Sequence, residues 1–193
     1  KASESASSNG LSHVAAMANA ALTRVASGSA GGDPAVLFKI AENGRASGKY
    51  EEAIAAYRNV IKSASATPEN LRKYVYPSWV GMAQSYAARQ LIVEAAAAYE
   101  VLIDEEAAGR LTPDKADAAT KKLVVEAYDR QRALATEIYN KTGDATDKRR
   151  RDEITSRVIA QQPKWQGESG AGSVSDLAYR QARELFTEAS KVK

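Results

Sequence analysis

The 193-residue chain contains no cysteine, one histidine, two phenylalanines and five prolines. Without cysteine it can form no disulfide, no thiolate metal site and no cysteine nucleophile. A hydrolytic triad would need the one histidine, His13, beside a nucleophile and a carboxylate, and nothing near His13 in the sequence suggests either. No run approaches the roughly 20 apolar residues that cross a bilayer, so we expect no membrane span. These absences disfavour several classes of enzyme and of integral membrane protein.

The sequence also contains few residue patterns that bind phosphates or metal ions. No glycine-rich loop ends in the lysine that a phosphate-binding loop requires, and the glycines of residues 28–32 are typical of a linker. Acidic neighbours such as Glu51 and Glu52 would point about 100° apart on a helix, which is unsuited to sharing one metal ion. We therefore predict that the protein is not an enzyme and holds no cofactor and no metal, and that a small-molecule ligand is disfavoured.

The net charge is +3, and the positive excess falls in the C-terminal third, chiefly at Lys148-Arg149-Arg150-Arg151. Nucleic-acid binding would need several cations on one face, commonly with aromatic residues nearby. Four consecutive cations spread around a helix, and acidic residues flank this run on both sides. We therefore expect a solvated helix face, with an acidic protein partner as the next alternative and no nucleic acid. An anionic lipid surface has no amphipathic support in the flanking sequence.

Helix signals dominate what the chain does contain. Alanine is abundant and aromatic residues make up only 7%, a balance that favours helices over strands. Asp33-Pro34 is typical of a helix start, and Gly48 of a helix end. Proline at position 77 should break or kink the helix that contains it. The predicted helices span residues 34–45, 50–64, 68–76, a segment that Pro77 opens, 92–106, 112–140, 147–162 and 175–192.

The first 33 residues are predicted to form an arm that is rich in serine, alanine and glycine. A narrow apolar stripe with helical spacing runs through residues 11–25, and a glycine-rich segment at residues 28–32 ends it. The chain begins at Lys1 without methionine, so we expect it to be processed or trimmed. A mature start rich in serine and alanine favours an exported bacterial protein over a cytoplasmic one, although a cropped chain would look the same.

Two segments of the chain repeat each other at an offset of 42 residues. Residues 48–61 (GKYEEAIAAYRNVI) return as residues 90–103 (QLIVEAAAAYEVLI), and the same offset places Ala41 onto Ala83. A repeat of this length indicates a supersecondary unit that buries its apolar face by stacking on a copy of itself. Small residues at equivalent positions suit helices that cross closely.

These segments resemble tetratricopeptide repeats, a family of helical hairpins. The residues that carry the resemblance are Leu37, Ile40, Ala41, Gly44, Ala53, Tyr57 and Val60 in the first unit, and Trp79, Met82, Ala83, Tyr86, Ala95, Tyr99 and Leu102 in the second. The period exceeds the family's usual ~34 residues, and the extra residues fall between positions 63 and 76. The resemblance implies an all-α, right-handed α-solenoid with two units, at about 34–65 and 76–107, preceded by the arm (1–33) and followed by further helices (108–193). Val124, Val125 and Tyr128 echo the pattern weakly.

The resemblance also implies a groove lined by the first helix of each unit. Carried over by position, its residues are Phe38, Glu42, Arg45, Val80, Gln84 and Ala88. Family members that hold the terminal carboxylate of heat-shock chaperones use lysine and asparagine on this wall, and this sequence lacks them there. Phe38 and Val80 are expected to face outward and to receive a peptide or helix. The resulting hypothesis is a non-enzymatic scaffold for a peptide or protein partner. The alternative is a structural subunit that associates with itself, with the arm docking on a neighbour.

Overall fold

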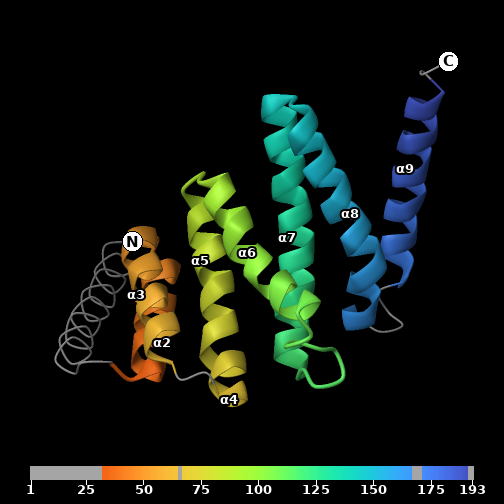
Figure 1. Ribbon diagram of the computed structural model, residues 1–193. Helices are drawn as coiled ribbons and strands as arrows, with labels where there is room; N and C mark the ends of the chain where they lie inside the picture. The colour runs from red at the N-terminus through yellow and green to blue at the C-terminus, as the bar shows by residue number, and fades with distance from the viewer. Residues whose placement is uncertain (1–31, 65–66, 167–170, 191–193) are drawn as a thin grey trace, which may run out of the picture. The chain divides into compact units, whose positions relative to one another are not determined.

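The computed structural model of the chain describes residues 32–64, 67–166 and 171–190. The regular elements of these residues are all helices, with no strand among them, which confirms the predicted all-α class (Figure 1). The chain divides into two compact units, Lys1–Arg89 and Gln90–Lys193, and this boundary lies between the two helices of the second expected repeat. Residues 1–31 of the predicted arm, His13 among them, lie outside the described residues.

The described residues of the first unit begin with a helical hairpin. Helix α2 (Pro34–Ala46) follows the N-cap Asp33, whose side chain accepts a hydrogen bond from the backbone N–H of Ala35 at 2.9 Å. It packs against α3 (Tyr50–Ser63), and the turn between them contains Gly48 with a φ of 73°, a left-handed conformation that favours glycine. Both bounds agree with the prediction to within a residue, because cap chemistry and a left-handed turn are local properties of the sequence.

The next segment changes its helical type just before Pro77, where the sequence predicts a kink or a break. A single turn, α4 (Pro68–Asn70), continues into a π-helical turn, η1 (Leu71–Val75), and then into α5 (Tyr76–Ala88). The helix is therefore not broken before Pro77. The wider turn, in which the Tyr76 N–H bonds to the carbonyl of Leu71, accommodates a proline that has no N–H to donate. Helix α5 packs against α3.

The second unit contains α6 (Ile92–Ala107) and α7 (Ala118–Thr142). The end of α6 near Gly109 follows the prediction, but α7 begins six residues later than expected. Asp117 caps it by accepting a hydrogen bond from the Thr120 N–H at 2.7 Å, whereas Thr112-Pro113 lies in the preceding turns. The buried side chain of Leu111, 4% exposed, anchors that connection. The sequence thus offers two N-cap signals close together, Thr112-Pro113 and Asp117, and the helix begins after the second.

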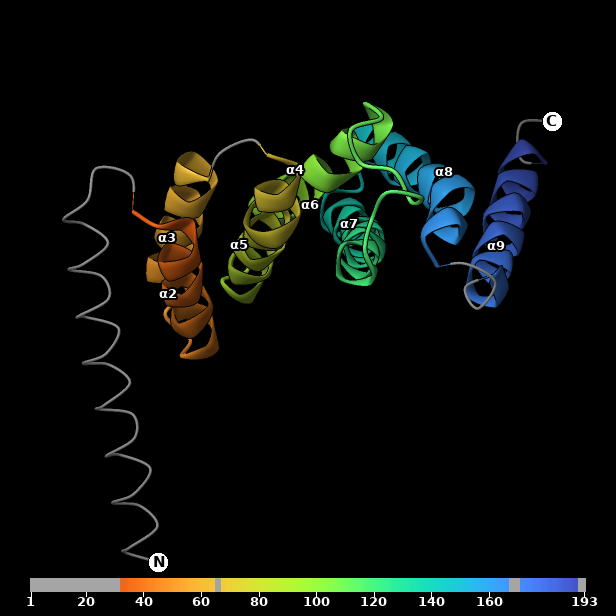
Figure 2. The same ribbon diagram turned by 90° about the horizontal axis from the view of Figure 1, so that it is seen from below.

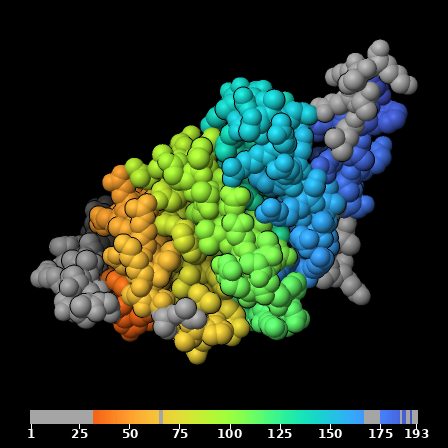
Figure 3. Space-filling view, viewed as in Figure 1, coloured from red at the N-terminus to blue at the C-terminus, as the bar shows by residue number. Residues whose placement is uncertain are grey.

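The last two helices are α8 (Ala145–Gln166) and α9 (Ala171–Ala189). Helix α8 exceeds its predicted bounds at both ends, whereas α9 begins at residue 171 rather than 175 and ends at residue 189 rather than 192. Helix α8 continues past Pro163 because Trp165, 3% exposed, is packed into the unit. Helix α6 packs against α7, α7 against α8, and α8 against α9. In both ribbon views α8 lies between α7 and α9 (Figures 1 and 2), and the space-filling view shows the atoms of α7 and α8 in contact (Figure 3).

The repeated positions share their degree of burial. Ala41, Ala53 and Tyr57 have no exposed surface, and their counterparts 42 residues later are 0–2% exposed. These counterparts are Ala83, Ala95 and Tyr99. At the crossing of α2 with α3, the place where a Cβ would project from Gly44 lies 3.4 Å from the Cβ of Ala53, so the two helices approach closely. Gly44 and Ala53 therefore lie at the close crossing of this hairpin, where the repeat pattern predicts small residues.

Candidate binding surfaces

The six groove residues predicted from the sequence lie on α2 and α5 of the first unit. Val80 is only 3% exposed, so the expectation that it faces outward is wrong. The reason is that α5 is buried around most of its circumference, with Ser78 and Ser85 buried as well as Met82 and Ala83. Gln84 is half-buried and Ala88 is exposed.

Phe38 is half-buried rather than freely exposed. Its ring lies 6.2 Å from the ring of Tyr57 and 6.1 Å from that of Tyr74, centroid to centroid, at tilted angles that aromatic pairs favour. Phe38 therefore contributes to packing within the first unit. The two large apolar members of the predicted groove, Phe38 and Val80, therefore leave less free apolar surface than the sequence suggested.

The two charged members, Glu42 and Arg45, form a cluster with Tyr57. The guanidinium of Arg45 contacts Glu42 at 2.8 Å and donates to the Tyr57 hydroxyl at 3.2 Å, and that hydroxyl donates in turn to Glu42. Burial, followed by the hydrogen bond to Glu42, raises the pKa of Tyr57 above its usual value of 10.0. The hydrogen bond to Glu42 is the largest influence on Arg45 and raises its pKa. These contacts fasten α2 to α3.

A more open surface lies in the second unit, where α6, α7 and α8 enclose a cleft of about 250 Å³. Buried side chains form its floor: Ala96 is 8% exposed, Ala135 5% and Ile154 7%. At the rim Val93 is 63% exposed, one of three large apolar side chains with such exposure among the described residues. We call this the α6–α8 cleft; its lining residues are Val93, Ala96, Ala97, Gln131, Ala135, Ile138, Asp147, Arg150 and Ile154.

Gln131 is the unusual member of the α6–α8 cleft. Its side chain is 1% exposed, and neither its amide nitrogen nor its amide oxygen has a hydrogen-bond partner. A buried amide without partners costs about 1–3 kcal/mol. Natural proteins rarely retain such groups without a reason, and a ligand that pairs with the amide is one reason.

Charged groups border the cleft. Arg150 projects from α8 and pairs with Glu100 of α6 at 2.7 Å. Asp147, at the start of α8, accepts a hydrogen bond from the Thr142 hydroxyl at 2.7 Å. The charges of Arg150 and Glu100 cancel each other in their ion pair. Asp147 is the other charged residue that lines the cleft, so it gives this border a negative charge. An apolar floor with a polar rim is the composition of many protein-binding sites.

The three helices that line the cleft are joined by a half-buried carboxylate, Glu106. It accepts hydrogen bonds from the Tyr128 hydroxyl and, at 2.9 Å, from Nε1 of Trp165, and thereby joins α6, α7 and α8. Tyr128 is 0% exposed and Trp165 3% exposed. Burial, followed by the bond to Glu106, raises the pKa of Tyr128. The three helices that line the cleft are therefore fixed relative to one another.

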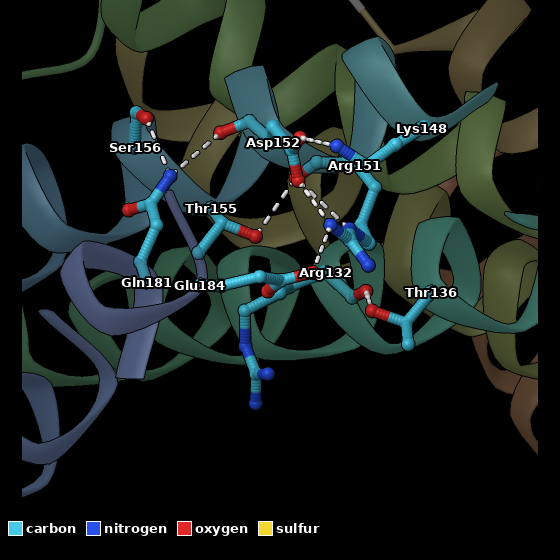
Figure 4. A network of polar contacts seen from close by, with 9 residues as sticks. All are labelled: Arg132, Thr136, Lys148, Arg151, Asp152, Thr155, Ser156, Gln181 and Glu184. Atoms are coloured by element: carbon cyan, nitrogen blue, oxygen red, sulfur yellow. Dashed lines mark hydrogen bonds and ion pairs between the residues drawn. The ribbon is translucent and has the colours of Figure 1, made fainter. Parts of the chain in front are cut away.

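The basic run lies on α8, where Lys148, Arg150 and Arg151 pair with carboxylates of the same chain. Arg151 contacts Asp152 at 2.6 Å and Glu184 of α9 at 2.9 Å (Figure 4). Burial lowers the pKa of Arg151, but the hydrogen bonds to the two carboxylates outweigh it and leave that pKa raised. The guanidinium also lies 4.8 Å from the ring centre of Tyr139 on α7. Arg151 thus connects three helices.

Further polar contacts attach α9 to α8. Gln181 donates to the Ser156 hydroxyl at 2.9 Å and to the Asp152 carbonyl at 3.3 Å, as Figure 4 shows. On the exposed part of α9, Tyr179 and Phe186 are 69% and 76% exposed. Helix α9 is therefore held by polar groups while two of its aromatic rings are left in solvent.

Sequence reasoning missed the α6–α8 cleft, because its residues come from three helices whose packing no short pattern encodes. One signal was present. Gln131 follows Val124, Ala127 and Tyr128 at helical spacing, so a polar amide occupies the buried stripe of α7.

Within the described ranges, no three histidine or acidic side chains gather in a way that could hold a metal ion. None of the helices in the described part of the chain has the length and apolar character of a membrane span. Comparisons of the chain with protein-family models, with curated proteins and with solved structures found no match.

Proposed function

We propose that the protein is a non-enzymatic scaffold, built from tetratricopeptide-like hairpins, that binds a peptide or protein partner through the α6–α8 cleft. The repeat assignment rests on the 42-residue offset and on the matching burial of Ala41, Ala53 and Tyr57 with their counterparts. Val124 and Tyr128 follow Met82 and Tyr86 at the same offset and are fully buried, which supports a further, divergent unit.

The observation that carries this proposal is the unpaired amide of Gln131 in a cleft whose floor is otherwise apolar. The cleft, at about 250 Å³, is smaller than the ~300–1,000 Å³ typical of sites for drug-sized molecules. It is larger than the ~150 Å³ cavity that accepts benzene. One large side chain of a partner fits such a space, and a polar group on it would satisfy Gln131.

The predicted groove of the first unit is a weaker candidate. Val80 is buried, Phe38 packs on two tyrosines, and Glu42 and Arg45 bind Tyr57. The alternative function, a subunit that associates with itself, is favoured by one observation: Tyr179 and Phe186 are exposed on α9.

Selection of a random peptide library displayed on phage against the purified chain tests the binding function. We expect enriched peptides to share an aromatic or large aliphatic side chain. Ala97→Arg, at an exposed position that lines the cleft, should weaken their binding about tenfold or more. Ala133→Arg is the matched control, since Ala133 is exposed on α7 outside the cleft. Equal binding by both variants would contradict the proposal.

The same peptides distinguish a binding role of Gln131 from a structural one. Gln131→Leu removes a buried amide without partners and should stabilise the protein by about 1–3 kcal/mol in urea denaturation. It should also weaken peptide binding, because the partner's polar group then has no counterpart. A destabilised Gln131→Leu variant that binds peptide normally would assign Gln131 to the core alone.

A further inference from the structure

The exposed aromatic residues of α9 form one face. Tyr179 and Phe186 lie seven residues apart, about two helical turns, and exposed Ala182 lies between them on the same side. A small residue between two rings leaves room for another helix to approach. Neighbouring large apolar side chains with 69% and 76% exposure are typical of an interaction site. We call Tyr179, Ala182 and Phe186 the α9 face.

We propose that the α9 face of one copy of the chain docks into the α6–α8 cleft of a second copy. The inference rests on the proposed function, since it names the occupant of the same cleft. A cleft of about 250 Å³ accepts one aromatic ring, and the α9 face supplies two rings already held on a helix.

The polar chemistry of the two surfaces also matches. A tyrosine hydroxyl both donates and accepts hydrogen bonds, so Tyr179 can pair with the Gln131 amide through either its nitrogen or its oxygen. This contact would satisfy the group that the isolated chain leaves unpaired. Phe186 would then pack at the rim near Val93, whose side chain is 63% exposed.

Charge complementarity favours this occupant as well. Arg183 is exposed one turn after Tyr179, so it borders the α9 face with a positive charge. The cleft border carries Asp147, while Arg150 is engaged by Glu100. Docking the α9 face would bring Arg183 toward this negative border, and such pairing contributes to orientation more than to affinity.

The cleft and the α9 face are different surfaces of one chain, so their contact is head-to-tail. An assembly of docked copies still has a free cleft on the copy at one end and a free α9 face on the copy at the other. Unless rotation closes a ring, such contacts extend without limit. We therefore expect open-ended assembly rather than a symmetric dimer.

Two complementary variants of the full chain test this contact in sedimentation velocity. Ala97→Arg blocks the cleft, and the double substitution Tyr179→Ser with Phe186→Ser removes the α9 face at exposed positions. The wild-type mass should rise continuously up to about 1 mM, where even a contact with a Kd of about 1 mM is substantially populated. Each variant alone should associate about tenfold or more weakly.

Mixing the two variants gives the decisive result. Each retains one intact surface, so an equal mixture should form one-to-one dimers that grow no further, while circular dichroism shows equal helicity in all samples. A wild-type chain that stays monomeric would overturn the inference, as would a dimer that Ala97→Arg leaves intact, which would indicate a symmetric α9 contact. Cleft-dependent peptide binding by a monomeric chain would overturn only this inference, and the absence of both would overturn the proposed function too.

Discussion

Replacing Glu106 with alanine is expected to destabilise the protein by about 2–4 kcal/mol, because two buried donors lose their acceptor at once. The Tyr128 hydroxyl and Nε1 of Trp165 both bond to this carboxylate, and their side chains are 0% and 3% exposed. Urea denaturation followed by circular dichroism measures the free energy of unfolding.

The neighbouring residue provides a matched control. Glu105 also carries a salt bridge, but its partner Arg110 has a side chain 62% exposed. Glu105→Ala should therefore cost less than about 1 kcal/mol, as exposed ion pairs do. Equal losses in the Glu105 and Glu106 variants would contradict the anchoring role that we assign to Glu106.

Replacing Gly81 with alanine should also be strongly destabilising, by about 1–3 kcal/mol. A Cβ at this position would overlap the ring of Tyr57, whose hydroxyl end lies in the same place. Tyr57 is 0% exposed and is held by Glu42 and Arg45, so its ring has little freedom to move. This steric cost outweighs the ~0.5–1 kcal/mol that alanine gains over glycine inside a helix.

Gly44→Ala separates these two effects. A Cβ there would meet Ala53 at 3.4 Å, an ordinary contact, and Gly44 lies within α2. The helix propensity of alanine should then leave stability unchanged or raise it by up to about 1 kcal/mol. Thermal denaturation of both variants provides the comparison. A similar shift in the same direction for Gly44→Ala and Gly81→Ala would show that α3 and α5 are not in the close contact described.

Features that depend on a few neighbouring residues could be predicted from the sequence. Asp33-Pro34 marked the start of α2, and Gly48 marked the turn after it. The alanines of the repeat, such as Ala53, are buried as the pattern required. Capping, left-handed turns and helical periodicity are local properties, which is why they can be recognised without knowledge of the packing.

Features that depend on tertiary packing were predicted less well. Pro163 was expected to lie beyond α8, but the buried Trp165 extends the helix past it. Val80 was expected at a groove, and the packing around α5 buries it. The α6–α8 cleft combines Val93, Gln131 and Asp147, which are far apart in the sequence, so only the packing of three helices brings them together.

A fluorescent label in the cleft tests the central claim, that the α6–α8 cleft binds protein, most directly. The chain has no cysteine, so Val93→Cys carries a polarity-sensitive dye at one exposed position, and Ala133→Cys places the same dye outside the cleft. Titration with a selected peptide, and separately with unlabelled full-length chain, should shift the emission of the dye at position 93 to the blue and leave that at position 133 unchanged. An unresponsive dye at position 93, or equal shifts at both positions, would contradict the account.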